Sequence, residues 1–215
     1  MIWYEKFNYK SNPLSIKPKA EFELFFDDKS LVNDIIKNIE DNQNILLKGA
    51  FGTGKTSILK KIIAEFGGKK KLFYYNAYSN NKPLNYDEVL KNAGNPISKF
   101  FMVKSKDVIL FIDEAHNLSS DNLEGVIPLL NTNFKSVILS SSKQDFVLPE
   151  VLNNNVKIKI NLENFTQKDA FNIVKDRLGE NQSILSDEEI LDVYNKSYTP
   201  RDFLLSLEDY CKNKF

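Results

Sequence analysis

The chain of 215 residues balances 29 Lys and Arg against 29 Asp and Glu, and 42% of its residues are hydrophobic. The zero formal net charge argues against a basic nucleic-acid surface over the whole molecule, although it leaves room for a local patch. No apolar run reaches the ~20 residues that cross a bilayer, the N-terminus has no signal-peptide pattern, and Cys211 is the single cysteine. These features predict a soluble, cytoplasmic protein with no internal disulfide and no membrane contact.

The predicted elements alternate between strands and helices up to about residue 160. Residues 1–28 are aromatic and irregular, and Pro13 and Pro18 oppose regular structure there. Apolar spacing predicts helices at 29–40, 57–66, 96–103 and 120–130, and strands at 45–47, 72–75, 108–112, 137–139 and 156–160. This alternation is typical of an α/β protein with a parallel sheet and helices on both faces, in which ligands bind beyond the carboxyl ends of the strands.

After residue 162 the pattern changes to helices alone, with candidates at 167–178, 187–196 and 201–212. Ser186 and Glu189 make a capping box for the second of these helices, and Pro200 suits the opening of the third. We therefore expect an α/β domain with an N-terminal arm at 1–161 and a helical lid at 162–215. Only two arginines occur, Arg177 and Arg201. Arginine is the usual donor of bidentate phosphate contacts, so each is a candidate for a functional role, and solvation on a helix surface is the expectation for Arg177.

A complete phosphate-binding loop lies between the first predicted strand and the helix that follows it. It fits G-x-x-x-x-G-K-[ST] and consists of Gly49, Ala50, Phe51, Gly52, Thr53, Gly54, Lys55 and Thr56, with Ser57 next. The glycines let backbone N–H groups turn toward a phosphate, and the start of the helix adds partial positive charge. Lys55 can reach the β- and γ-phosphates, and the Thr56 hydroxyl can ligate Mg²⁺. The loop therefore predicts binding of a nucleoside triphosphate.

Two carboxylates, Asp113 and Glu114, directly follow the apolar strand at 108–112. An acidic residue at this position is placed to hold the Mg²⁺ shell, and Glu114 could polarise the attacking water. The alternative is that the pair only caps the next helix with favourable charge. The phosphate loop favours the catalytic interpretation. His116, the only histidine, is interpreted as structural, and no metal site is expected there.

Three consecutive serines, Ser140, Ser141 and Ser142, follow the predicted strand at 137–139. A hydroxyl at this point could hydrogen-bond the γ-phosphate or the attacking water, but serines also end strands for plain solubility. The residues alone do not select one of the three. Ser140 or Ser141 is preferred, and Ser140 is placed in the catalytic set.

Together these segments resemble the AAA+ ATPases over nearly the whole chain. Residues 49–56 resemble the Walker A loop, 109–114 the Walker B strand, 139–141 sensor 1, and 199–202 the sensor 2 motif. The resemblance implies a P-loop NTPase three-layer fold with a five-stranded parallel sheet in the order 5-1-4-3-2, followed by a small helical lid. It also implies ATP and Mg²⁺ as cofactors, Arg201 at the γ-phosphate, and Asn76 as a switch residue that pairs with Glu114 at rest.

Within that class, the sequence is most similar to the replication-initiator and origin-recognition branch and to ATPases of DNA transposition and secretion. The phrases that carry this likeness are Asn12-Pro13-Leu14 ahead of Phe25-Phe26, residues 51–57 and residues 112–118. By that resemblance the N-terminal arm, including Ile16 and Phe25, would lie near the adenine base. Ordinary core packing is the alternative for these side chains.

The sequence departs from the AAA+ pattern in two ways. AAA+ assemblies usually supply an arginine finger from a neighbouring subunit, whereas residues 113–156 contain no arginine. Lys135 or Lys143 could substitute as a point charge, another protein could provide the arginine, or intrinsic turnover is slow. Replication initiators also continue into a winged-helix domain, and here the sequence stops at Phe215. DNA binding would then use the AAA+ body or a partner.

The leading hypothesis is an AAA+ ATPase that binds and hydrolyses Mg-ATP to switch lid conformation and partner affinity, in DNA replication or DNA mobilisation. The alternative is a nucleotide-gated protein-assembly or secretion ATPase that does not bind nucleic acid. The predicted catalytic set is Lys55, Glu114, Arg201 and Ser140, and the predicted metal ligands are Thr56 and Asp113. The candidate partners are a second copy of the chain in a homo-oligomer, a partner ATPase that supplies an arginine finger, and DNA.

Overall fold

The computed structural model describes residues 2–16, 29–79, 83–93, 105–162 and 165–215. The expected helix at 96–103 and the side chain of Phe25 lie outside these residues. The chain divides into two compact units. The sheet unit comprises Leu31–Ala50 and Lys61–Leu162, and the helical unit comprises Met1–Ser30, Phe51–Lys60 and Glu163–Phe215.

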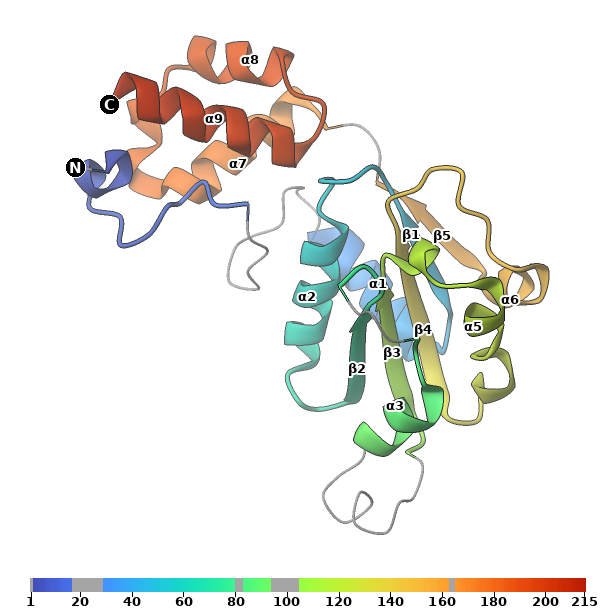
Figure 1. The fold of residues 1–215 in the computed structure, drawn as a ribbon. Coiled ribbons are helices and arrows are strands. Elements are labelled where there is room, and N and C mark those ends of the chain that lie inside the picture. The colour runs from blue at the N-terminus through green and yellow to red at the C-terminus, as the bar shows by residue number, and fades with distance from the viewer. Residues whose placement is uncertain (1, 17–28, 80–82, 94–104, 163–164) are drawn as a thin grey trace. The chain divides into compact units, whose positions relative to one another are not determined.

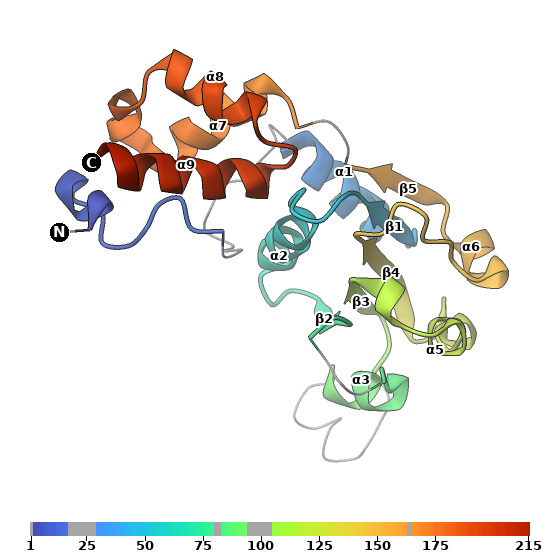
Figure 2. The same ribbon diagram turned by 45° about the horizontal axis from the view of Figure 1, so that its top comes forward.

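The sheet unit is built on five parallel strands in the order β2-β3-β4-β1-β5 (Figures 1 and 2). The strands are β1 (Ile45–Lys48), β2 (Lys71–Asn76), β3 (Val108–Asp113), β4 (Phe134–Ser141) and β5 (Ile158–Asn161). Read from the other edge, this is the expected order 5-1-4-3-2, so the predicted fold class is confirmed. The register pairs Lys48 with Ser141 and Asn76 with Asp113, so the carboxyl ends of β1 to β4 lie at one edge of the sheet.

Burial along the strands follows their positions in the sheet. Every residue of the inner strand β3 is buried, whereas the outer strand β5 alternates between partly buried and exposed residues. A strand with helices over both faces needs apolar side chains on both, which explains the unbroken run at Val108–Ile112. The polar residue Asp113 therefore ends an apolar strand, at the sheet edge where parallel sheets bind ligands.

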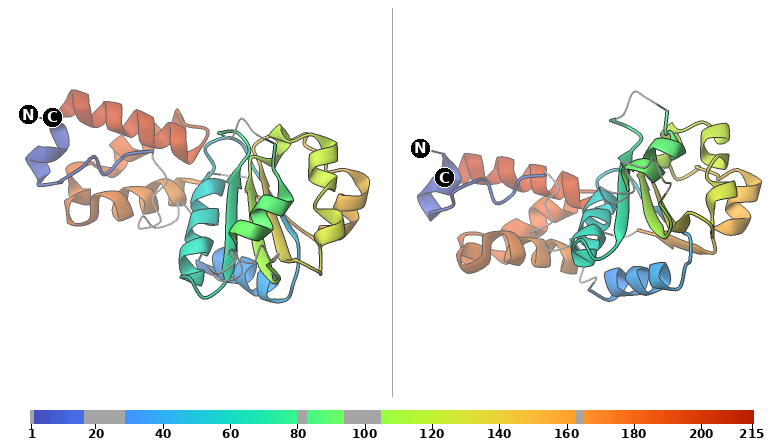
Figure 3. Two further views of the ribbon diagram at one scale, coloured as in Figure 1. Left: turned by 60° about the horizontal axis from the view of Figure 1, so that its bottom comes forward. Right: turned by 90° about the horizontal axis from the view of Figure 1, so that it is seen from below.

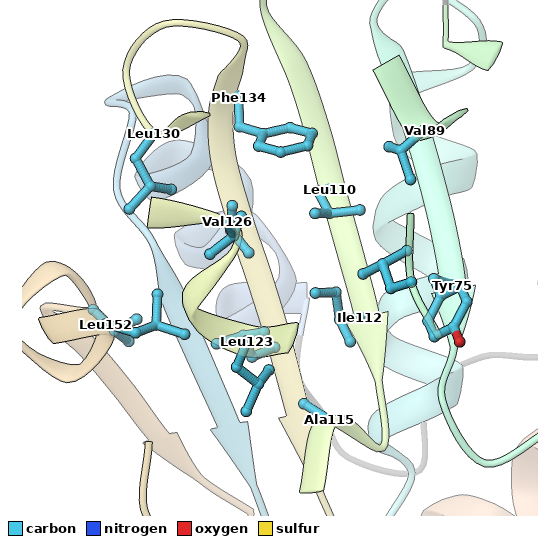
Figure 4. Packing of buried hydrophobic residues seen from close by; sticks show 14 of the residues in the cluster. Tyr75, Val89, Leu110, Ile112, Ala115, Leu123, Val126, Leu130, Phe134 and Leu152 are labelled. Carbon is cyan, nitrogen blue, oxygen red and sulfur yellow. The ribbon is translucent and has the colours of Figure 1, made fainter. Parts of the chain in front are cut away.

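Helices cover the two faces of the sheet. The helices that the structure describes here are α1 (Lys29–Glu40), α2 (Lys55–Phe66), α3 (Tyr86–Asn92), α5 (Ser120–Glu124) and α6 (Glu150–Asn155). Helix α1 lies on one side of the sheet, and α3, α5 and α6 lie on the other (Figure 3). On the second side, Val89, Leu123 and Leu152 from these helices pack with Leu110 and Ile112 of β3 (Figure 4).

Several boundaries differ from the expectation. The predicted helix at 120–130 is two short pieces, α5 and a 3-10 turn at Ile127–Leu129, because Pro128 has no backbone N–H to continue an α-helix. Helices α3 and α6 were not predicted. The N-terminal residues expected to be irregular contain a 3-10 helix at Trp3–Phe7.

The helical unit contains α7 (Gln167–Leu178), a 3-10 helix at Gly179–Ile184, α8 (Asp187–Asn195) and α9 (Pro200–Lys214). Ser186 and Glu189 form the expected capping box of α8, and Thr199 caps α9 with Pro200 at its first turn. The three helices share a core with Trp3 and Leu14 of the N-terminal arm. The arm therefore packs with the C-terminal helices, while the predicted domain limits at 161 and 162 stay a prediction.

Candidate nucleotide-binding site

The phosphate-binding loop occupies residues 49–54, between the end of β1 and the start of α2 at Lys55. Gly52 and Gly54 have φ angles of 92° and 95°, in the region that side chains disfavour, so glycine is required at both turns. The N–H of Gly49 donates to the carbonyl of Ser141 at 3.3 Å, which places the start of the loop beside the end of β4. The expected strand–loop–helix context of the motif is therefore present.

Asp113 is fully buried, and its carboxylate is held by hydroxyl groups from both neighbouring strands. The Tyr74 hydroxyl of β2 donates to Oδ2 at 2.7 Å, and the Ser140 hydroxyl of β4 donates to Oδ1. The Asn76 amide also donates to Oδ2, at 3.4 Å. Burial, followed by the charge of Asp113, raises the pKa of the Tyr74 phenol, so this hydroxyl stays a proton donor. Tyr74 was not among the predicted site residues.

Glu114 is held through a single carboxylate oxygen. Its Oε2 accepts hydrogen bonds from the Ser142 hydroxyl at 2.7 Å and the Ser142 N–H at 3.1 Å, and it lies 3.3 Å from His116 Nδ1. The side chains of Glu114 and His116 are each 12% exposed, so solvent screens these contacts only slightly. Ser142 and His116 were both left out of the predicted catalytic set, and the structure places both beside Glu114.

The three serines after the apolar part of β4 have three different environments. Ser140 is fully buried and accepts the Glu114 N–H at 3.0 Å, in addition to its bond to Asp113. Ser141 lies 3.3 Å from His116 Nδ1 and exchanges hydrogen bonds with the backbone of Lys143. Ser142 alone of the three donates to the carboxylate of Glu114. The role of Ser140 as sensor 1 stays a prediction.

Asn76, the predicted switch residue, makes hydrogen bonds at the end of β2, and its switch role stays a prediction. Its Oδ1 accepts the N–H groups of Tyr78 and Ser79, both at 3.0 Å, and thereby fixes the turn after β2. Its amide points to Asp113, as described above.

Arg201 is the second residue of α9, the last helix of the helical unit, and lies against the phosphate-binding loop segment of the same unit. Its guanidinium carbon is 4.9 Å from the centre of the Phe51 ring. A Cβ built on Gly52 would be 2.7 Å from Cβ of Arg201 and 2.9 Å from Oγ1 of Thr199. Glycine is therefore required at residue 52 for close approach as well as for its backbone angle.

The expectation for Arg177 was wrong. Arg177 is buried, and its guanidinium donates to the carbonyls of Pro13 and Ser15, both at 3.2 Å. Burial lowers the pKa of this guanidinium to about 10. Arg177 thus ties the N-terminal arm to α7. Ile16 packs at the edge of the same helical core, and its predicted place near adenine stays a prediction.

The predicted magnesium ligands fit the chemistry of that ion. Mg²⁺ prefers oxygen ligands and usually takes only one or two from the protein, with the rest from water and phosphates. The carboxylate of Asp113 and the hydroxyl of Thr56 are donors of this kind. Within the described residues, no group of three or more His, Cys, Asp and Glu side chains could hold a metal by itself, so an all-protein metal cage is not present in that part of the chain.

The fold and the loop define a P-loop nucleotide-binding protein. The AAA domain family matches residues 41–171, which is more than half of the 215-residue chain. The chain therefore belongs to the AAA domain family, and the predicted resemblance to AAA+ ATPases is confirmed. No curated protein sequence is significantly similar to it.

Solved structures share this fold at low sequence identity. A crystal structure titled as a DNA replication initiation factor has a TM-score of 0.63 at 20% identity and covers 90% of this chain and 64% of its own. Cdc6p from Pyrobaculum aerophilum has a TM-score of 0.64 at 16% identity, covering 91% and 63%. A RuvB variant from Thermotoga maritima has a TM-score of 0.61 at 18% identity, covering 84% and 61%. The chain thus spans about three fifths of these longer proteins. No helix of the described residues is both long and apolar enough to span a bilayer.

Proposed function

We propose that this protein binds and hydrolyses Mg-ATP and uses the nucleotide to change the position of its C-terminal helices and its affinity for a partner. One observation carries the proposal: the phosphate-binding loop starts beside the end of β4, at the sheet edge where Asp113 ends β3 and Glu114 follows it. Membership of the AAA domain family supports ATP as the nucleotide.

In this proposal each residue has a separate task. Lys55 and the N–H groups of residues 49–56 bind the phosphates, and Glu114 accepts a proton from the attacking water. Asp113 and Thr56 would hold magnesium, which when bound neutralises charge that develops on the phosphates. Arg201 contacts the γ-phosphate, so that loss of this group releases the helix that begins with Pro200.

Two variants test the assignment. Lys55→Ala should abolish binding of ATP, measured by calorimetry, because the charge that pairs with the phosphates is removed. Glu114→Gln should bind ATP with normal affinity and release phosphate at a rate lowered by about two orders of magnitude or more, the size expected when a general base is removed. Rapid hydrolysis by the Glu114→Gln protein would defeat this role for Glu114.

We further propose that the partner is DNA or a protein bound to DNA, in replication or DNA mobilisation. The folds shared with a DNA replication initiation factor and with RuvB support this choice. The zero formal net charge favours the second candidate, an ATPase of protein assembly or secretion that does not bind nucleic acid. DNA binding that falls steeply with salt supports the first candidate, and salt-independent or absent binding supports the second.

A separate question is which molecule supplies the trans-acting arginine. Residues 113–156 contain no arginine, so we propose that another protein supplies it or that a lysine replaces it at lower efficiency. Turnover is measured against protein concentration, with and without DNA. A rate per molecule that rises with concentration indicates self-assembly, and a rate that rises only with DNA indicates a nucleic-acid role.

A further inference from the structure

Phe51 is an exposed aromatic residue of the phosphate-binding loop, at a position whose backbone N–H, and not its side chain, is expected to face the phosphate. Its phenyl side chain is 64% exposed. The guanidinium of Arg201 lies over its face at 4.9 Å from the ring centre, which is within the range of a cation–π contact. Both residues belong to the helical unit.

Apart from this contact, Arg201 has no polar partner among the described residues. Its guanidinium makes no hydrogen bond or ion pair with any residue that the structure describes, so the Phe51 ring is its principal partner there. A ring face holds a guanidinium through its π electrons and leaves the N–H groups at the edge of the cation unused. As far as the described residues are concerned, the N–H donors of Arg201 therefore stay available for an anion.

The backbone on both sides of this contact is fixed. Thr199 caps the helix through the Asp202 N–H at 3.2 Å, and Pro200 occupies its first turn. Gly52 approaches this helix start so closely that a Cβ on it would be 2.7 Å from Cβ of Arg201. The loop and the helix start thus hold the backbones of Phe51 and Arg201 close together. The two side chains therefore lose little further conformational freedom when they stack.

We propose that Phe51 is a positioning residue that holds Arg201 ready for the terminal phosphate and thereby sets the preference for ATP over ADP. This inference rests on the proposed function, because it takes Arg201 as the contact of the γ-phosphate. Without the ring, the long arginine side chain samples several rotamers and must be ordered when ATP binds. The contribution of Phe51 is therefore expected only for a nucleotide that carries the γ-phosphate.

The measured quantity is the ratio of the dissociation constants for ADP and for a non-hydrolysable ATP analogue, both with Mg²⁺, by calorimetry. Phe51→Leu keeps an apolar side chain of similar size and the backbone N–H but removes the π face. It should lower the preference for the ATP analogue about two- to fivefold, the range of a cation–π contact at an exposed site. Phe51→Tyr keeps the ring and should restore the preference.

Tyr198 provides a matched control, because it is an aromatic residue three positions before Arg201 and is 92% exposed. Tyr198→Leu should leave the ratio unchanged. In the Arg201→Ala background, Phe51→Leu should have no further effect, because the ring then has no cation to hold.

The outcomes separate the two proposals. If Arg201→Ala lowers the preference for the ATP analogue but Phe51→Leu does not, the role of Phe51 is wrong and that of Arg201 stands. An equal effect of Phe51→Leu with and without Arg201 also overturns the inference, because the ring then acts on the nucleotide directly. If the wild-type protein binds neither nucleotide, or if Arg201→Ala leaves the ratio unchanged, the proposed function of the site fails first.

Discussion

Replacing Ser142 with alanine tests whether Glu114 is held in a productive position. The Ser142 hydroxyl donates to Glu114 Oε2 at 2.7 Å, and the Ser142 N–H, which alanine keeps, donates to the same oxygen at 3.1 Å. No residue that the structure describes donates to the other carboxylate oxygen, Oε1. One oxygen is thus fixed and the other is available to accept a proton from water, so we expect Ser142→Ala to slow hydrolysis.

The size of the effect follows from the lost bond. A hydrogen bond to a charged group contributes about 1.5–3 kcal/mol net, and the 12% exposure of the Glu114 side chain leaves little screening by solvent. The remaining N–H and the contact with His116 keep part of the orientation, so roughly half of this energy should reach the transition state. A loss of about 0.75–1.5 kcal/mol lowers kcat about four- to twelvefold. Ser142→Thr keeps a hydroxyl and should retain most of the rate.

The assay is steady-state phosphate release measured over a range of Mg-ATP concentrations, which gives kcat and KM separately. We expect kcat to fall in Ser142→Ala with an unchanged KM, because the bond is made to Glu114 and not to the nucleotide. In the Glu114→Gln background, Ser142→Ala should add little, since both changes act on one group. An unchanged rate would refute the reasoning, and a raised rate would show that Ser142 restrains Glu114 in an idle position.

Three further predictions concern stability and reactivity. Arg177→Met should lower the free energy of unfolding in urea by about 1–3 kcal/mol, because two carbonyls of the N-terminal arm lose a charged donor; an unchanged midpoint would contradict the anchoring role. Burial raises the pKa of the Cys211 thiol to about 12, so alkylation at pH 8 should require unfolding, and fast labelling of the native protein, seen by mass spectrometry, would contradict this. The hydrogen bond from Lys214 is the largest cause that lowers the pKa of Glu189 from 4.5 to about 2. This group therefore stabilises the fold above pH 4.5 and loses that contribution as pH falls toward 2, so Glu189→Gln should flatten the fall of Tm in that window, and an unaltered slope would argue against it.

The centre of the sheet could be predicted from the sequence, and its borders could not. The apolar run at Val108–Ile112 gave the inner strand because a strand covered on both faces must be apolar at every position. The strand predicted at 137–139 extends from Phe134 to Ser141 because β4 pairs with both β1 and β3, and its ladders continue past the apolar residues. Hydrogen bonds to adjacent strands can extend a strand into residues whose side chains show no strand pattern in the sequence.

The candidate site also has parts that the sequence predicts and parts that it does not. The phosphate-binding loop was found because one continuous motif specifies it, whereas three adjacent serines could not be told apart. Side chains alternate along β4, and only the fold shows that Ser140 faces Asp113 while Ser142, beyond the strand, reaches Glu114. Arg177 was misjudged because its partners, at Pro13 and Ser15, are more than 160 positions away in sequence. Contacts at such separation follow from tertiary packing and not from local pattern.

The backbone at Glu114 explains how two adjacent carboxylates come to have different surroundings. Glu114 has φ 56° and ψ 45°, a left-handed conformation that costs a residue with a side chain about 1–3 kcal/mol. Hydrogen bonds hold it there: its N–H donates to Ser140 at 3.0 Å, and its carbonyl accepts the N–H and the amide of Asn117, both at 3.0 Å. The turn directs Glu114 to Ser142 and His116, while Asp113 stays buried against Tyr74 and Ser140. A strained residue that is fixed on both sides of its backbone is typical of a functional position, and here it separates a buried carboxylate suited to a cation from a partly accessible one suited to water.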